Sequence, residues 1–156
     1  MEIPILSASE RQQICREMWT GMMHGITSFI MRKLGPDALE ELNSEVASGC
    51  ASDMKARGVD SPVKFAMNYA VVNKNVFGSE GVSVEGDAYE AVLTTARCAN
   101  LESAMELGSR GMPITRNEYC SGCIDGYFKK VAENLGFGLE AEFTERGCRI
   151  KIQRDA

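Results

Sequence analysis

The sequence has one histidine, His24, among its 156 residues. This scarcity excludes any metal or catalytic site that needs two imidazole groups from one chain. The sequence also has no run near the roughly 18 consecutive apolar residues of a membrane span, and its first residues lack a positively charged leader. We therefore expect a cytoplasmic protein that does not contact membranes.

Charge of one sign is not concentrated anywhere along the chain. The formal net charge is -5, and acidic and basic residues are interspersed, without the basic stripe that phosphate backbones require. The sequence also has no P-loop, dinucleotide fingerprint or nucleophile elbow. We therefore expect no nucleic-acid partner.

The length and the 44% hydrophobic content suit one domain with an ordinary core. We expect a single small-molecule-binding domain over residues 1–156, in which residues 1–78 are helical. Residues 79–156 are expected to form a hairpin, two helices and a second hairpin. The sequence shows no internal repeat or linker that would divide it further.

The spacing of apolar residues changes along the chain from a helical to a strand period. Helical spacing predicts helices over 9–34, from Pro36 to Gly58, and from Pro62 onward. A two-residue period then predicts strands over 82–84 and 89–97. Because glycine and aspartate separate these two runs, they are expected to form a hairpin.

Two more helices and a second hairpin are predicted after Arg97. Asn100 is expected to cap a short helix, and Thr115 and Glu118 have capping-box spacing for a helix that runs to about Leu135. Residues 137–153 then alternate as a hairpin with charged side chains on its outer side. The sequence therefore predicts an α+β fold, with N-terminal helices and two further helices packed on an antiparallel sheet of about four strands built from two hairpins.

Six cysteines are expected to be reduced, because the chain is large enough to fold without disulfides. Cys120 and Cys123 share the apolar face of a predicted helix, Cys148 shares a side with core isoleucines, and Cys98 ends a strand. Their spacing, C-x21-C-x2-C-x24-C, is compatible with a zinc or iron site made by all four thiolates. The alternative is core packing, since free cysteine behaves as a small hydrophobe.

A second hypothesis gives these thiols a chemical role. Cys98 precedes a predicted helix, whose N-terminus favours a thiolate nucleophile, and His24 is a candidate base. Glu118 is a candidate proton shuttle. For His24 the alternative is a surface residue or a hydrogen-bonded core residue.

The first helix and the tyrosines are candidates for contacts with a ligand or a partner. Its methionines can fill a core, line a pocket for a flat or oily ligand, or dock onto another chain, and the last of these predicts a homodimer through the N-terminal helices. Candidate ligand-binding residues are Trp19, Met22, His24 and Tyr127.

Several of these residues, taken in order, resemble a known family. Met18-Trp19 in a helical N-terminal part, Arg97-Cys98 at a strand end, Cys120 on a helix and Gly147-Cys148 in the last hairpin are similar to the L-2-amino-thiazoline-4-carboxylic acid hydrolase-like family. The order also resembles the related 4-vinyl reductase domain, a small-molecule-binding module in which cysteines near the last hairpin can hold zinc. The resemblance covers roughly residues 14–152.

The resemblance implies an α+β domain with a ligand pocket between helices and sheet, and it singles out Cys98, Cys120 and Cys148. Zinc-holding members commonly have a second cysteine in the final hairpin region, whereas this chain has only Arg146-Gly147-Cys148 there. Cys123 is the candidate replacement for that ligand. The expected function is binding of a small molecule in a cysteine-lined, metal-holding pocket, with hydrolysis of a carbon-nitrogen bond. The alternative is a non-catalytic ligand sensor or binding module with a structural zinc site.

Overall fold

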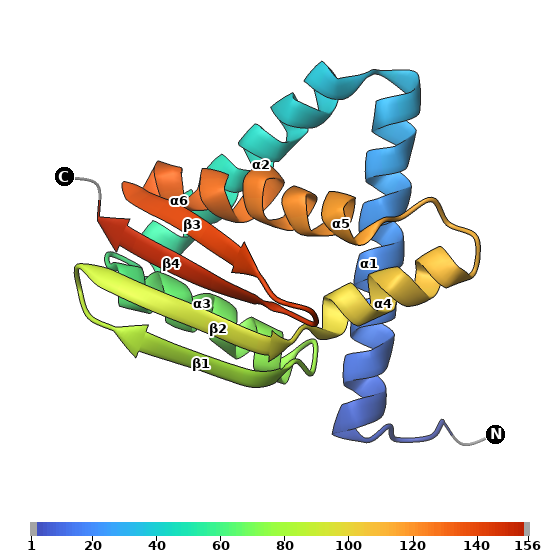
Figure 1. Ribbon diagram of the computed structural model, residues 1–156, viewed down its shortest axis with the longest axis horizontal. Helices are drawn as coiled ribbons and strands as arrows, with labels where there is room; N and C mark the ends of the chain where they lie inside the picture. The colour runs from blue at the N-terminus through green and yellow to red at the C-terminus, as the bar shows by residue number, and fades with distance from the viewer. Residues whose placement is uncertain (1–2, 155–156) are drawn as a thin grey trace.

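The computed structural model describes residues 3–154 and confirms the predicted α+β fold (Figure 1). One antiparallel sheet and the helices that cover it form the domain. In chain order the elements are α1 (Ala8–Lys33), α2 (Pro36–Ala56), α3 (Pro62–Asn75), β1 (Glu80–Gly86), β2 (Glu90–Arg97), α4 (Ala99–Ser109), α5 (Arg116–Cys123), the π-helical segment η1 (Ile124–Phe128), α6 (Lys129–Leu135), β3 (Phe137–Phe143) and β4 (Cys148–Arg154).

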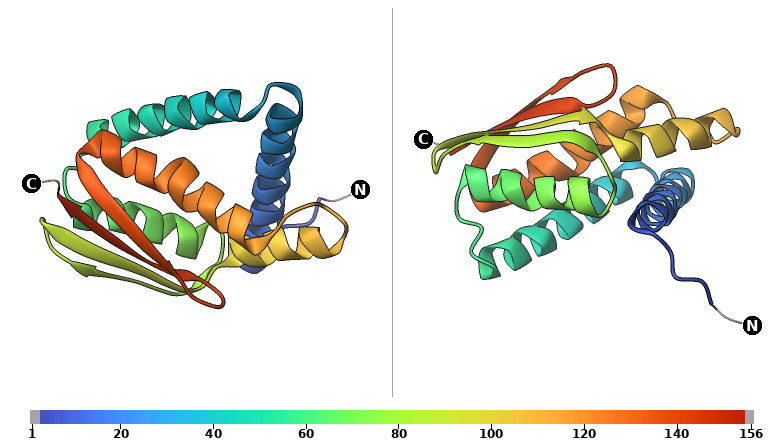
Figure 2. Two further views of the ribbon diagram at one scale, coloured as in Figure 1. Left: turned by 45° about the horizontal axis from the view of Figure 1, so that its top comes forward. Right: turned by 90° about the horizontal axis from the view of Figure 1, so that it is seen from below.

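The two predicted hairpins lie side by side in a four-stranded sheet of order β1-β2-β4-β3. Strand β2 pairs with β4, so that Leu93 lies opposite Ile150 and both are buried. The helices lie on one side of this sheet (Figure 2). The hydrophobic core is therefore between the inner side of the sheet and helices α2, α3 and α6.

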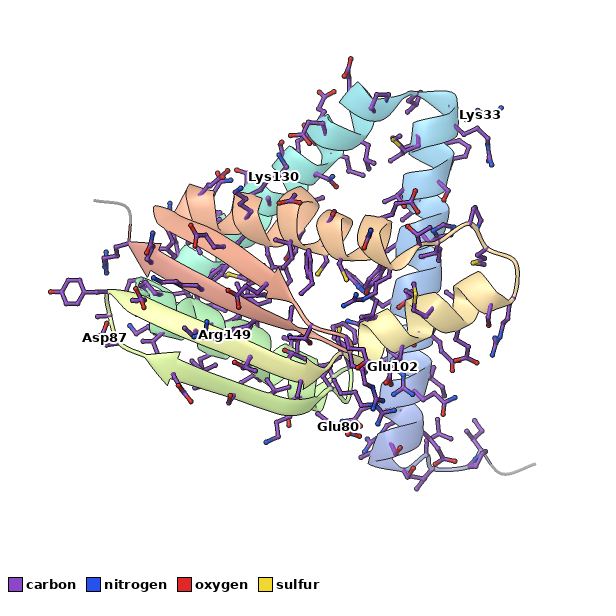
Figure 3. All side chains as sticks on the ribbon, viewed as in Figure 1. Lys33, Glu80, Asp87, Glu102, Lys130 and Arg149 are labelled. Atoms are coloured by element: carbon purple, nitrogen blue, oxygen red, sulfur yellow. The ribbon has the colours of Figure 1, made fainter. Side chains whose placement is uncertain are left out.

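The outer side of the last hairpin carries charges in the predicted register. Glu140 lies opposite Lys151, and Glu142 lies opposite Arg149, whose exposed side chain is labelled in Figure 3. Lys151 forms its ion pair across the other strand boundary instead, with Glu90 of β2 at 2.9 Å. Pairs as exposed as this one contribute little to stability.

Local sequence signals set the helix ends. Thr115 and Glu118 form the predicted capping box of α5, and proline occupies the first turns of α2 and α3. The predicted cap of α4 at Asn100 is wrong by two residues, because Cys98 is the N-cap and Asn100 lies within the first turn. Asparagine favours cap positions in general, but here the end of β2 sets the start of the helix.

The helix predicted from Thr115 to Leu135 is one rod in space, but it contains the π-helical segment η1 (Figure 1). This segment begins immediately after Cys123. Gly126 lies within it, and a β-carbon on Gly126 would come 3.3 Å from Asn43 Nδ2 of α2. π-Helical turns are rare and often occur at functional sites.

Helix α1 stands at the edge of the molecule and contacts α4 and α2 (Figures 1 and 2). Thr20 is its one fully buried residue. The apolar stripe predicted for α1 is largely exposed, and Met18, Met22 and Phe29 are 69%, 54% and 52% exposed. Among residues 3–154, no helix is long and apolar enough to cross a membrane.

Candidate functional site

Strand pairing brings two of the predicted cysteines to the same end of the sheet. Cys148 lies opposite Thr95 in the β2–β4 register, and Cys98 follows Thr95 by three residues. The backbone N–H of Cys98 donates to the carbonyl oxygen of Arg146 at 2.8 Å. This hydrogen bond therefore holds the end of β2 against the residues that precede Cys148.

The α5 cysteines lie close to this end of the sheet. Burial raises the pKa of Cys123, and the neighbouring thiols of Cys98, Cys148 and Cys120 raise it further. Burial likewise raises the pKa of Cys148 to about 12, with added contributions from Cys98 and Cys120. Because such effects need short distances, Cys98, Cys120, Cys123 and Cys148 form one group, called here the thiol cluster.

The thiol cluster does not have the geometry of a metal site. Within residues 3–154, no group of three or more His, Cys, Asp or Glu side chains is arranged to hold a metal ion. All six cysteines are free thiols. A zinc site of four thiolates needs their sulfurs about 2.3 Å from one point. A zinc or iron site at these four cysteines therefore stays a prediction.

Phenol groups line the thiol cluster on two sides. Burial raises the pKa of Tyr119 of α5, as do Cys123 and Cys98, and Tyr119 also lies beside Thr20 of α1. On the other side, burial raises the pKa of Tyr127 of η1 to about 12, and its ring lies 6.3 Å from that of Tyr69. Aromatic and hydroxyl groups from α1, α3, α5 and η1 thus lie beside these partly exposed cysteines.

Three buried hydroxyl groups around the cluster have no hydrogen bond of normal geometry among the described residues, namely Oγ1 of Thr20, Oγ1 of Thr95 and the hydroxyl of Tyr69. Thr20 lies beside the hydroxyl of Tyr119, and Tyr69 lies beside that of Tyr127, so Thr95 is the clearest case of a buried hydroxyl without a partner. A buried polar group without a partner costs about 1–3 kcal/mol, so such groups are rare in folded proteins. We call these three hydroxyls, the thiol cluster, Tyr119 and Tyr127 the interior site.

The unpartnered hydroxyl of Thr95 gives a direct prediction. Thr95 is 2% exposed, and Thr95→Val replaces its hydroxyl with a methyl group of similar size. Because the ligand-free protein loses an unpartnered polar atom, we expect Thr95→Val to raise the free energy of unfolding by about 1 kcal/mol. Urea unfolding measures this change. A loss of stability would mean that the hydroxyl already has a partner, and Thr94→Val, on the outer side of β2, is the matched control.

The predicted catalytic partners of Cys98 lie elsewhere. Glu118 is exposed, and its carboxylate accepts hydrogen bonds from the hydroxyl and the backbone N–H of Thr115 at 2.6 and 3.1 Å, which lower its pKa. This carboxylate therefore caps α5. The Nε2 atom of His24 lies 3.2 Å from Ser28 Oγ, and in the described part of the chain no hydrogen bond joins His24 to Cys98.

Two predicted ligand-binding residues of α1 are also outside the interior site. The ring of Trp19 lies 6.2 Å from that of Phe77, which follows α3, and Met22 is more than half exposed. Of the four predicted ligand-binding residues, the structure brings Tyr127 to the thiol cluster. Thr20, rather than Trp19 or Met22, is the residue of α1 that reaches the interior site.

Two surface hollows lie away from the interior site. One, of about 330 Å³, lies between α1 and α3, beside Gln12 and Cys15. Another, of about 610 Å³, lies between α2 and α3, beside Lys64 and Met67. Neither is lined by the thiol cluster, whose four cysteines are each partly exposed.

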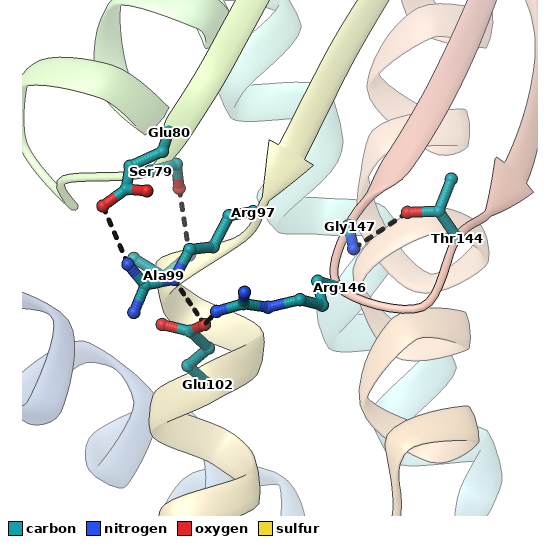
Figure 4. Close-up of polar contacts among 8 residues, drawn as sticks. All are labelled: Ser79, Glu80, Arg97, Ala99, Glu102, Thr144, Arg146 and Gly147. Carbon is teal, nitrogen blue, oxygen red and sulfur yellow. Dashed lines mark hydrogen bonds and ion pairs between the residues drawn. The ribbon is translucent and has the colours of Figure 1, made fainter.

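A network of charged residues closes the end of the sheet beside Cys98 (Figure 4). Arg97 donates to Glu102 at 2.6 Å and to Glu80 at 2.8 Å, and Arg146 donates to Glu102 at 2.8 Å. Glu80 and Glu102 are labelled at this end of the molecule in Figure 3. The network joins β1, β2, α4 and the β3–β4 turn around the thiol cluster.

The chain matches no protein-family model, and no curated protein matches it at a significant level. The interior site is therefore the basis on which its function is inferred.

Sequence reasoning missed Thr20 and Thr95 as site residues. A signal for Thr95 was present, because it follows Ala91 and Leu93 on the inner side of β2, where a polar residue is unexpected. Thr20 carried no such signal. It lies among exposed apolar residues on α1, and its burial depends on how α1 meets Tyr119.

Proposed function

We propose that this chain is a cytoplasmic small-molecule-binding domain whose ligand occupies the interior site. The observation that carries the proposal is that the buried hydroxyl of Thr95 has no hydrogen-bond partner among the described residues and lies opposite Cys148, beside the thiol cluster. Hydroxyl, phenol and thiol groups can offer hydrogen bonds without a formal charge. They suit a small, uncharged or weakly charged, flat molecule whose acceptor atoms meet the hydroxyls and whose body lies against Tyr119 and Tyr127.

The protonated state of the four thiols favours ligand binding without catalysis. Burial raises the pKa of Cys98, Cys120, Cys123 and Cys148, so the nucleophilic thiolate is scarce at neutral pH. Within residues 3–154, neither predicted partner contacts Cys98, since Glu118 caps α5 and His24 contacts Ser28, and the nearby Glu102 is paired with Arg97 and Arg146. The proposal therefore follows the sensor or binding-module alternative, without requiring the structural zinc.

Hydrolysis of a carbon-nitrogen bond is the second candidate, and one observation favours it. Burial raises the pKa of Cys98, but the backbone N–H groups of Leu101 and Asn100 at the start of α4 act in the opposite direction. The start of α4 thus partly offsets the effect of burial on the Cys98 thiol. The resemblance to the L-2-amino-thiazoline-4-carboxylic acid hydrolase-like family points to the same residue.

Titration calorimetry with a panel of small, uncharged cyclic amides tests the proposal, and L-2-amino-thiazoline-4-carboxylic acid, which carries a charged carboxylate, tests the hydrolase candidate. We expect at least one compound to bind the natural protein, and Thr95→Val to weaken that binding by roughly tenfold, equivalent to about 1.4 kcal/mol. Thr94→Val is expected to bind normally. Binding that is unaffected by Thr95→Val would place the ligand elsewhere and contradict the proposal.

Two further measurements separate the candidate functions. Product analysis after incubation detects hydrolysis, and Cys98→Ser should abolish any activity that depends on the thiolate. Elemental analysis of anaerobically purified protein, with Cys120→Ser and Cys123→Ser alongside, tests the predicted metal. About one zinc or iron per chain that is lost in both variants would confirm the metal site, at the expense of the metal-free site proposed above.

A further inference from the structure

Helix α1 carries large apolar side chains on its outward side, where a helix that packs on its own domain normally has polar ones. Its inward side includes Thr20, which is buried, and Thr27, whose hydroxyl donates to the Met23 carbonyl oxygen at 2.9 Å. Its outward side carries large apolar side chains that are 42–69% exposed. These residues, called here the outer face of α1, are Ile14, Met18, Met22, Ile26 and Phe29.

Exposed apolar residues in isolation need no explanation, but a continuous stripe along one helix does. Positions 14, 18, 22 and 29 recur at intervals that place them on one side of the helix. The stripe runs along most of α1, whose 26 residues span about 39 Å. Nothing in the described part of the chain covers it.

Gly25 lies within this stripe, between Met22 and Phe29. A glycine in a helix interior lowers helix stability relative to alanine, so the glycine at position 25 needs an explanation. Packing within the chain gives none, because a β-carbon at Gly25 would meet no atom within 4 Å. A glycine on an exposed helix face leaves a notch that a large side chain of another helix can fill.

We propose that the outer face of α1 pairs with the same face of a second copy of this chain, with the two helices antiparallel. A two-fold axis between Met22 and Gly25 places Met22 of each copy over Gly25 of the other. The same register places Met18 of each copy against Phe29 of the other, and thioether–aromatic contacts of this kind are favourable. The face is thus complementary to itself, as a two-fold interface requires.

The two ends of α1 differ in charge. Its last turn carries Arg32 and Lys33, whereas in its first half Glu10 and Glu17 are balanced by Arg11 and Arg16. A parallel pair would place the two cationic ends side by side, and the antiparallel pair places each of them against a neutral segment of the partner helix. The interface is one helix wide, so a dimer that dissociates on dilution is expected rather than an obligate one.

This inference goes beyond the proposed ligand binding and does not depend on it. Sedimentation equilibrium of the full chain from about 1 to about 100 µM should show a reversible dimer. Met18→Lys and Phe29→Glu should each weaken it by roughly tenfold or more, because each leaves a charge against an apolar residue. The double variant should recover dimerisation, since the antiparallel register turns the two substitutions into two cross-helix ion pairs.

Gly25→Ala provides a test that a folding defect cannot imitate. Alanine favours the helix and meets nothing within the chain, so the monomer should be as stable as before or more stable. The added methyl group fills the notch for Met22, so dimerisation should weaken by roughly tenfold. Met67→Glu, at an exposed position of α3, is the matched control and should leave dimerisation unchanged.

A natural chain that stays monomeric over this concentration range would overturn the inference. Equal weakening by Met67→Glu would also overturn it, because the contact would then involve another surface. The antiparallel register would be excluded by two results together. The double variant would fail to recover dimerisation, and Gly25→Ala chains would dimerise normally.

Discussion

Gly147→Ala is expected to unfold the protein or to cost roughly 3 kcal/mol or more of its stability. A β-carbon at Gly147 would lie 1.9 Å from the carbonyl oxygen of Thr95 and 3.0 Å from that of Ala96. Both oxygens belong to β2, which is paired on its two sides with β1 and β4. Because these neighbours hold the strand in place, the methyl group can fit only if the end of the sheet separates.

Urea unfolding of Gly147→Ala and Gly122→Ala measures this effect against a matched control. Gly122 lies on α5, where a β-carbon would meet no atom within 4 Å, so Gly122→Ala should be neutral or slightly stabilising. A Gly147→Ala variant within about 0.5 kcal/mol of the natural protein would contradict the close approach of β4 to β2. The substitution should also disturb the interior site, because Gly147 precedes Cys148 and touches Thr95.

Alkylation of Cys148 is expected to be roughly 1,000-fold slower in the folded protein than in the unfolded chain at pH 8. The thiolate is the reactive form, and burial together with Cys98 and Cys120 raises the pKa of Cys148 from 9.0 to about 12. The folded protein therefore holds a far smaller fraction of thiolate at this pH. The rate should rise about tenfold per pH unit while the fold persists, because the thiolate fraction does so well below the pKa.

Mass spectrometry of peptides after timed exposure to iodoacetamide measures these rates. The same chain in concentrated urea gives the reference rate for each cysteine. A Cys148 rate in the folded protein that equals the rate in urea would show a solvated thiol. That outcome would contradict the burial of Cys148, and it would favour the nucleophilic role considered for Cys98.

The helices, the strands and the side-chain register of the fold were predictable from the sequence, because they depend on short-range signals. The capping box of Thr115 and Glu118 began α5 as predicted, and alternation in the last hairpin placed Glu140 opposite Lys151. Two adjacent hairpins also predicted the antiparallel sheet. The strand order β1-β2-β4-β3 could not be predicted from these signals, since the pairing of β2 with β4 depends on packing between segments distant in sequence.

The site was harder to predict from the sequence, because its residues come together only through tertiary packing. The inward direction of Cys120 and Cys123 followed from helical spacing, whereas the buried hydroxyl of Thr20 depends on where α1 meets α5. The π-helical turn after Cys123 has no pattern of apolar residues that distinguishes it from an α-helix. The exposure of Met22 likewise reflects which side of α1 faces the domain.

Anomalous diffraction from sulfur, recorded on crystals of anaerobically purified protein, tests the central claim most directly because it locates each thiol without reference to the chain trace. The account predicts that the sulfurs of Cys98, Cys120, Cys123 and Cys148 form one group. It also predicts a bound molecule or ordered water within hydrogen-bonding distance of Thr20, Thr95 or Tyr69. Sulfur peaks that are dispersed, each surrounded by hydrocarbon and with no such density beside the three hydroxyls, would contradict it.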